Sequence, residues 1–309
     1  MFPCSNPELV GAVSKAGGLG IIQPLSLTHV HGHRLREGLQ LTRRLADGKP
    51  LGLNALIESS SRAYHRRIVE SVDVALEEGV RFFVTSLGKP DWVVERVNQV
   101  GGLVFHDVTD RRWALKGLDA GVHGLIAVNR CAGGHAGHKS AEELIDELGD
   151  LGVPLICAGG ISTPAGFANA LGLGYQAVQM GTRFIATDEC RVSDAYQRAI
   201  VEAREEDIVL SERITGVPLA LIRTPYVERM GLRAGPVARW MLRGRRRKRL
   251  MRLVYAVRAS RRMKRASLDE RGGQELWQAG RSVAGIDAIL SAEEIVRQFA
   301  AATPTSAVE

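Results

Sequence analysis

The sequence predicts an α/β protein with a TIM-type (β/α)8 barrel, whose first strand is missing or truncated, and a helical basic insert towards the C-terminus. Two observations support the barrel. Short apolar, β-branched runs alternate with segments of helical periodicity, which is typical of a parallel sheet covered by helices. Polar residues also follow several successive strands, whereas a doubly wound sheet would concentrate ligand-binding residues at one switch point.

Seven strands are expected, each from a short apolar run bounded by Gly, Pro or polar residues. The runs are GLGIIQ at 18–23, LGLNAL at 51–56, RFFVTS at 81–86, GLVFHD at 102–107, GLIAVN at 124–129, PLICAGG at 154–160 and AVQMGT at 177–182. A closed barrel needs one more strand. Since the chain opens at Met1 directly before a helical pattern, we expect strand one to be absent or truncated, with the true start codon upstream.

Helices are expected where apolar residues recur at helical spacing and the segment ends in Gly. The clearest segments are 6–17, 32–48, 61–79 and 140–152. Ser140 is followed three residues later by Glu143, which is the pattern of a capping box. A helix should therefore begin at this point.

Polar residues stand at or just beyond the carboxyl ends of the predicted strands, where a barrel assembles its active site. They are Asn54, Thr85 with Ser86, His106 with Asp107, and Asn129. Gly159 with Gly160 and Gly181 with Thr182 follow the last two strands. Two adjacent glycine loops of this kind favour a phosphate site, because a Cβ would keep the backbone amides away from the phosphate oxygens.

Composition excludes several classes of protein. With 45% hydrophobic residues the chain can bury a full core, so it is neither disordered nor fibrous. The four cysteines are far apart and form no CxxC pair, which argues against a disulfide framework or a zinc ribbon. The N-terminus has no signal-peptide pattern, and no apolar run is long enough to span a bilayer. We expect a cytoplasmic protein.

The net charge of +7 is concentrated in one segment. Residues 233–265 contain 14 Lys and Arg and no Asp or Glu, so the rest of the chain carries a net charge of −7. We therefore divide the chain into a barrel at 1–225, a basic helical insert at 226–270, and a C-terminal helical segment at 271–309 that completes the cap.

The basic insert has several possible roles. Leu250, Leu253, Val254 and Val257 recur at helical spacing and predict an amphipathic helix. It could be a solvated insert that packs on the body, or it could bind an anionic membrane or an acidic protein at 233–265. Nucleic acid is not expected, because Tyr255 is the only aromatic residue in its densest part.

Four motifs together resemble the FMN-dependent nitronate monooxygenase family, formerly called 2-nitropropane dioxygenases. They are Gly-Leu-Asn at 52–54, Gly-Gly-His at 133–135, Ala-Gly-Gly-Ile at 158–161 and Gln-Met-Gly-Thr at 179–182. The resemblance extends over about 7–187 and resumes at 277–296. The family also contains flavin enoyl-acyl-carrier-protein reductases and NADH:quinone reductases.

The resemblance implies a site for FMN across the barrel mouth. Gly133 and Gly134 would allow the backbone close to the flavin ring, and His135 would be the catalytic base. The other FMN-binding residues implied are Asn54, Gly159, Gly160, Gln179, Met180, Gly181 and Thr182. A His with an ordinary pKa near 6.5 can take a proton from the carbon beside a nitro group at neutral pH. In that family the nitronate reduces FMN, oxygen reoxidises it, and a carbonyl compound and nitrite are released.

Several departures from the family pattern leave alternatives open. Asp107 stands where many members have a lysine, Cys131 where an acidic residue is common, and Arg281 where glutamine is common. The alternatives are an NAD(P)H-dependent flavin reductase of the quinone or enoyl type, and a degenerate flavin barrel that docks to an anionic surface. A metal site formed by Cys131, His135 and His138 is a further alternative, but no second cluster completes a tetrahedral set, so no metal is expected.

Overall fold

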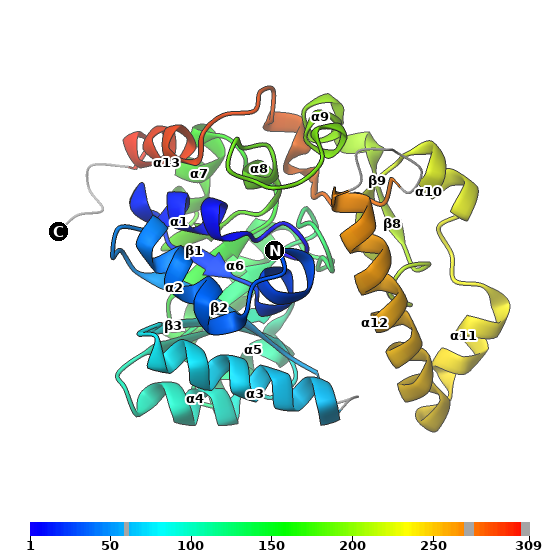
Figure 1. Cartoon of the computed structure of the whole chain (residues 1–309), viewed down its shortest axis with the longest axis horizontal. Coiled ribbons are helices and arrows are strands. Elements are labelled where there is room, and N and C mark those ends of the chain that lie inside the picture. The colour runs from blue at the N-terminus through cyan, green and yellow to red at the C-terminus, as the bar shows by residue number, and fades with distance from the viewer. Residues whose placement is uncertain (59–61, 269–274, 304–309) are drawn as a thin grey trace.

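The computed structural model describes residues 1–58, 62–268 and 275–303. A parallel sheet of seven strands, in the order β1 to β7, forms the centre of the larger part of the molecule (Figure 1). The strands are β1 Gly20–Ile22, β2 Leu51–Ile57, β3 Phe82–Leu87, β4 Leu103–Val108, β5 Gly124–Val128, β6 Leu155–Ala158 and β7 Ala177–Gln179. All seven strands expected from the sequence are therefore confirmed.

Helices precede, connect and follow these strands, and those between strands cover the outer face of the sheet. They are α1 Pro7–Lys15, α2 Leu35–Leu45, α3 Arg62–Glu77, α4 Asp91–Asn98, α5 Arg111–Asp119, α6 Ala141–Leu148, α7 Pro164–Gly172, α8 Thr182–Ile185 and α9 Asp194–Glu202, with a π-helical turn at Ser26–Val30. The capping box at Ser140 and Glu143 is present at the start of α6. Helix α13, Ala292–Ala301, returns to pack beside α1 and α7.

The sheet is curled but open, so the closed barrel is confirmed only in part. Within the described residues β1 and β7 do not pair with each other. The segment 1–6 lies between them, because Ser5 Oγ donates to the carbonyl of Ile21 at 3.0 Å and the Met1 side chain lies against Gly181, just after β7. The N-terminal segment thus occupies the gap between the two edge strands without forming a strand.

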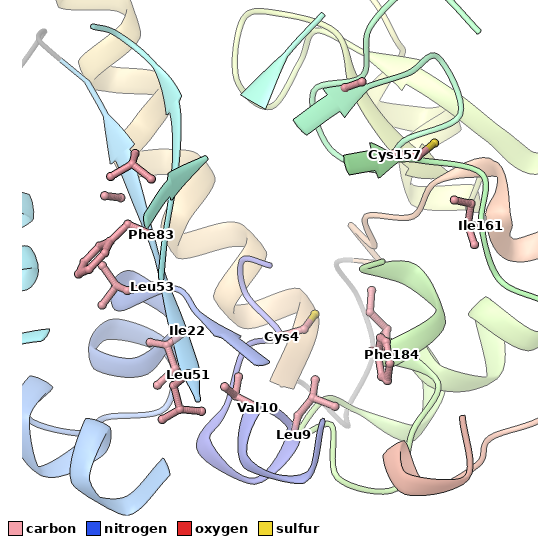
Figure 2. Packing of buried hydrophobic residues seen from close by; sticks show 14 of the residues in the cluster. Cys4, Leu9, Val10, Ile22, Leu51, Leu53, Phe83, Cys157, Ile161 and Phe184 are labelled. Atoms are coloured by element: carbon pink, nitrogen blue, oxygen red, sulfur yellow. The ribbon is translucent and has the colours of Figure 1, made fainter. Parts of the chain in front are cut away.

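The two faces of the sheet have separate hydrophobic clusters. Leu53, Phe83 and Val104 pack outwards with the helices in the main core, part of which is shown in Figure 2. Val84 and Phe105, their neighbours along the strands, belong to a smaller cluster on the concave face. Because side chains alternate between faces, this assignment decides which polar residues point into the curled sheet.

Two of the polar residues expected to line the site point away from the concave face of the sheet. Thr85 and His106 lie on the helix side, where both are buried and Thr85 Oγ1 hydrogen-bonds His106 Nδ1 at 2.9 Å. Burial lowers the pKa of His106 to about 4. The expectation that this pair lines the site is therefore wrong, because it rests on position along the strand and ignores the alternation of faces.

A second, smaller body follows α9. It contains an antiparallel hairpin of β8, Ile208–Ser211, and β9, Leu219–Ile222, which the sequence reading did not anticipate. Helices α10 Pro225–Met230, α11 Pro236–Arg243 and α12 Arg245–Leu268 come next. The hairpin, α10 and α12 share a hydrophobic cluster that runs in sequence from Val209 to Leu276. The division of the chain at 225 and 270 stays a prediction.

The long helix expected in the basic segment is present as α12. Among its described side chains, the buried apolar ones are Ala259, Met263 and Ala266, in its C-terminal half. The apolar stripe expected from the sequence is nearer the N-terminal end of α12. Of its four residues, Val254 is half-buried, and the side chains of Leu250, Leu253 and Val257 lie outside the described residues. Across the described residues, none of the helices is both long enough and apolar enough to cross a membrane.

Candidate active site

Three loops meet at the carboxyl ends of β5, β6 and β7. Gly159, with φ +115°, lies so close to the β5 loop that a Cβ would stand 2.3 Å from Asn129 Oδ1 and 2.6 Å from the backbone nitrogen of Ala132. Gly160, with φ +79°, lies against the side chain of Cys131. The sequence-predicted glycines after β6 therefore allow two loops to pack against each other, and only glycine accommodates both the conformation and the contact.

Asn129 connects the same two loops with its side chain. Its Oδ1 accepts a hydrogen bond from the backbone N–H of Cys131 at 2.8 Å, and its Nδ2 donates to the carbonyl of Gly159 at 2.9 Å. Because Asn129 is buried, these bonds are shielded from competing water. The sequence placed Asn129 at the site, and the structure gives it a positioning role.

The third loop, which follows β7, is hydrogen-bonded to a segment near the C-terminus that begins after residue 277. Thr182 Oγ1 accepts a hydrogen bond from the backbone N–H of Gly280 at 2.9 Å, and the N–H of Arg281 donates to the carbonyl of Cys131 at 2.9 Å. Gly133 and Gly280 face each other so closely that a Cβ on Gly280 would stand 2.5 Å from the nitrogen of Gly133. Gly133 therefore has an immediate packing role that the resemblance did not indicate.

His135 is held by the β8–β9 hairpin. The carbonyl of Gly134 accepts from the N–H of Ala220 at 2.9 Å, and His135 Nδ1 lies 2.9 Å from the carbonyl oxygen of Pro218. A carbonyl only accepts, so Nδ1 carries the proton and Nε2 of the neutral ring keeps its lone pair. The imidazole is exposed, and Nε2 can therefore act as a base towards a molecule arriving from solvent.

Polar side chains from three strands share the concave face of the sheet. Asn54, Asp107 and Gln179 alternate with residues of the outer core, namely Ala55, Val108 and Val178. Within the described part of the chain, none of the three makes a side-chain hydrogen bond, and Asp107 Oδ1 is buried without a partner. Such groups are available to a polar ligand.

Asp107 differs electrostatically from an ordinary surface carboxylate. Burial raises its pKa to about 7, while the nearby amino group of Met1 acts in the opposite direction. At neutral pH a large fraction of this carboxyl is protonated and can donate a hydrogen bond. The sequence identified Asp107 as a polar residue at a strand end and as a departure from the family pattern, but its raised pKa depends on burial, which cannot be recognised from one residue type.

The remaining sequence-predicted residues lie beside these loops. Gly181 precedes α8 and contacts the side chain of Met1, while Met180 is half-buried against the main core. Among the described residues no side-chain hydrogen bond joins Asn54 to the glycine loops, and it is assigned to the site through the shared concave face. A metal cluster of Cys131, His135 and His138 is not assembled among the residues described.

The hairpin is the part of the site that the sequence reading missed. Pro218 and Ala220, its residues that touch the His135 loop, lie about 80 positions further along the chain. The sequence pattern that indicates a hairpin here is the stretch IVLSERITGVPLALI at 208–222, in which Gly216 and Pro218 lie between two apolar runs.

Comparison with protein families gives a match over residues 1–301 to the family described as nitronate monooxygenase. One similar relative is a nitronate monooxygenase of Paraburkholderia phytofirmans, 27% identical over 259 residues, which cover 70% of each chain. A solved structure of FabK from Thermotoga maritima superposes with a TM-score of 0.76 at 29% identity, covering 98% of this chain and 90% of that one.

A second relative carries a different name. It is the (3aS,4S,5R,7aS)-5-hydroxy-7a-methyl-1-oxo-octahydro-1H-indene-4-carboxyl-CoA dehydrogenase of Mycobacterium tuberculosis, 29% identical over 230 residues, or 73% of this chain. The match spans 62% of that relative's length, so this chain corresponds to about three fifths of it. The relatives therefore share an ancestry with this chain but differ in the activities after which they are named.

Proposed function

Because the chain belongs to the nitronate monooxygenase family, whose members are flavin-dependent oxidoreductases, we propose that it uses FMN to oxidise alkyl nitronates with molecular oxygen, giving a carbonyl compound and nitrite. The observation that carries the proposal is the fixed tautomer of His135, whose Nε2 is free to accept a proton beside the glycine loops.

The residues present fit FMN. The glycine loops at Gly159–Gly160 and Gly181 follow adjacent strands and can present backbone N–H groups to a phosphate. Asn54 and Gln179 offer unpartnered amides on the concave face, where they could hydrogen-bond the polar edge of the ring. When bound, FMN supplies the acceptor for the two electrons that leave the substrate.

His135 would convert a neutral nitroalkane into the nitronate. Its Nε2 takes a proton from the carbon beside the nitro group, and the resulting imidazolium keeps its Nδ1 hydrogen bond to Pro218. Because the ring is exposed, the proton can then pass to solvent. Pro218 acts as a positioning residue, since its carbonyl selects the tautomer in which Nε2 is the base.

The visible spectrum of the purified protein tests the proposal. We expect a yellow protein whose flavin absorption is bleached under anaerobic conditions by an alkyl nitronate and not by NADH, and which recovers its colour in air with release of nitrite. A colourless protein that does not take up FMN would overturn it.

A second candidate is an NAD(P)H-dependent flavin reductase of the quinone or enoyl type. It is favoured by the 29% identity to FabK over nearly the whole chain and by the relative named as a CoA dehydrogenase. Anaerobic bleaching by NADH or NADPH, with no response to nitronate, would select it. The two candidates therefore differ in one spectroscopic experiment.

A further inference from the structure

A groove in the second body has an apolar floor. It has a volume of about 500 Å³ and is lined by Met230 and Pro236 on one side and by Met251, Val254 and Tyr255 of α12 on the other. This volume lies within the range of ligand-binding clefts. Flexible methionines on such a surface can adapt to an apolar chain.

Three arginines stand around the same groove. They are Arg213, from the loop of the hairpin, and Arg258 and Arg262, which are exposed on α12. None of them forms an ion pair with a carboxylate in the described part of the chain. Arg213 Nε donates to the carbonyl of Met230 at 2.8 Å, which holds this guanidinium at the groove. Guanidinium groups bind phosphate oxygens in a bidentate manner, so an apolar groove edged by arginines that have no carboxylate partner matches a ligand with both an apolar chain and a phosphate.

An exposed tryptophan lies on α11 in the same hairpin of helices. Trp240 is 59% exposed, and the guanidinium carbon of Arg247 stands 3.7 Å from its ring centroid. Tryptophan is enriched where apolar chains meet polar headgroups, because its ring is apolar and its N–H still needs a partner. The pair combines the two properties that a membrane interface attracts.

Helix α12 is anchored to the rest of the molecule through its C-terminal half. Trp277 Nε1 donates to the carbonyl of Ala266 at 3.0 Å, and the N–H of Ser193 donates to the carbonyl of Ser267 at 2.7 Å. The other end of α12 and helix α11 extend away from the seven-stranded sheet, at the right of Figure 1. The tryptophan and the start of the arginine-rich helix are therefore presented at the far side of the molecule.

We propose that this helical hairpin, α11 and α12, docks on membranes through anionic phospholipid, with lipid phosphates against Arg213, Arg258 and Arg262 and an acyl chain in the groove. The segment 233–265 contains 14 basic residues and no acidic one, so nothing within it repels an anionic surface. An acidic protein would match the charge alone. The phospholipid also accounts for the apolar floor and for Trp240.

Vesicle sedimentation with the full-length flavin-loaded protein tests this docking. We expect binding to phosphatidylcholine vesicles that contain about one third phosphatidylglycerol, release by salt, and no binding to pure phosphatidylcholine. The variant Arg258→Gln/Arg262→Gln should bind about 30-fold more weakly, which corresponds to about 1 kcal/mol for each charge removed. The matched control, Arg66→Gln/Arg112→Gln, removes the same charge from exposed positions on α3 and α5 and should bind as the wild type does.

Tryptophan fluorescence gives a second readout. Anionic vesicles should shift the emission to shorter wavelength in the wild type and in Trp113→Ala, but not in Trp240→Ala. Trp113 is a suitable control because it is also partly exposed, at 40%, with Lys116 Nζ 4.3 Å from its ring centroid.

Several outcomes would overturn the proposal. They are absence of sedimentation with anionic vesicles, equal loss of binding in both arginine variants, or an unchanged shift in Trp240→Ala. Displacement from vesicles by inorganic phosphate or coenzyme A at concentrations that leave ionic strength unchanged would instead identify a soluble phosphate ligand. Flavin content and nitronate turnover play no part in these readouts, so the docking and the proposed chemistry can fail separately.

Discussion

The imidazole of His135 donates from Nδ1 to the carbonyl oxygen of Pro218, 2.9 Å away. The two residues belong to different bodies of the molecule: His135 follows the fifth strand of the parallel sheet, and Pro218 precedes the second strand of the hairpin. The backbone bond from Ala220 to Gly134 fixes the same two segments together. The hairpin therefore sets the tautomer of the candidate base.

Replacing His135 with Ala should slow anaerobic flavin bleaching by a neutral nitroalkane by about 10²- to 10⁴-fold, the usual contribution of a general base. Bleaching by preformed nitronate should change much less, because the carbon has already lost its proton. Stopped-flow absorbance measures both rates. The control is His138→Ala, which changes an exposed histidine three positions further along and should leave both rates as in the wild type. An equal loss of rate with both substrates in His135→Ala would contradict the role of His135 as a base.

Gly159→Ala should destabilise the protein by about 2 kcal/mol or more and weaken FMN binding. The added Cβ would meet Asn129 Oδ1 at 2.3 Å, and the residue would keep a φ of +115°. Urea unfolding and flavin titration measure the two effects. Gly172→Ala, at the end of α7, where a Cβ meets nothing within 4 Å, should be neutral or slightly stabilising. Wild-type stability of Gly159→Ala would exclude the tight contact between the two loops.

Thr182→Val should lower the unfolding free energy by about 1–3 kcal/mol, because it leaves the N–H of Gly280 without its acceptor. Valine has nearly the same shape, so the loss isolates the hydrogen bond. Thr182→Ser keeps the hydroxyl and should recover most of the stability. If Val and Ser behave alike in denaturant titrations, the bond between these two loops contributes little.

Asp107→Asn should change how stability depends on pH. Burial raises the pKa of Asp107 from 3.8 to about 7, so the folded protein holds a proton that the unfolded chain releases between these values. The wild type should therefore lose stability as pH rises from about 4 to above 7, and Asn should remove this component, with a gain on the order of 4 kcal/mol at pH 8. Urea titrations at pH 5 and pH 8 measure the difference. A parallel decline in both proteins would show that another group titrates.

Local patterns were sufficient for the seven strands of the parallel sheet and for helices α1, α2, α3, α6 and α12. The run LGLNAL predicts β2 because its residues suit a strand covered on both faces, and Ser140 with Glu143 predicts the start of α6 because a capping box satisfies backbone donors within four residues. In each case the physical cause acts between residues that are close in sequence.

The sequence by itself determined the parallel α/β architecture, the location of the basic segment and the family to which the motifs point. Only the tertiary structure decided that Thr85 and His106 face the helices while Asp107 faces the concave side, and that Pro218 orients His135. It also showed that position 133 requires a glycine because Gly280 lies against it. These relationships depend on the curvature of the sheet and on segments tens to more than a hundred residues apart, and no local periodicity encodes such contacts.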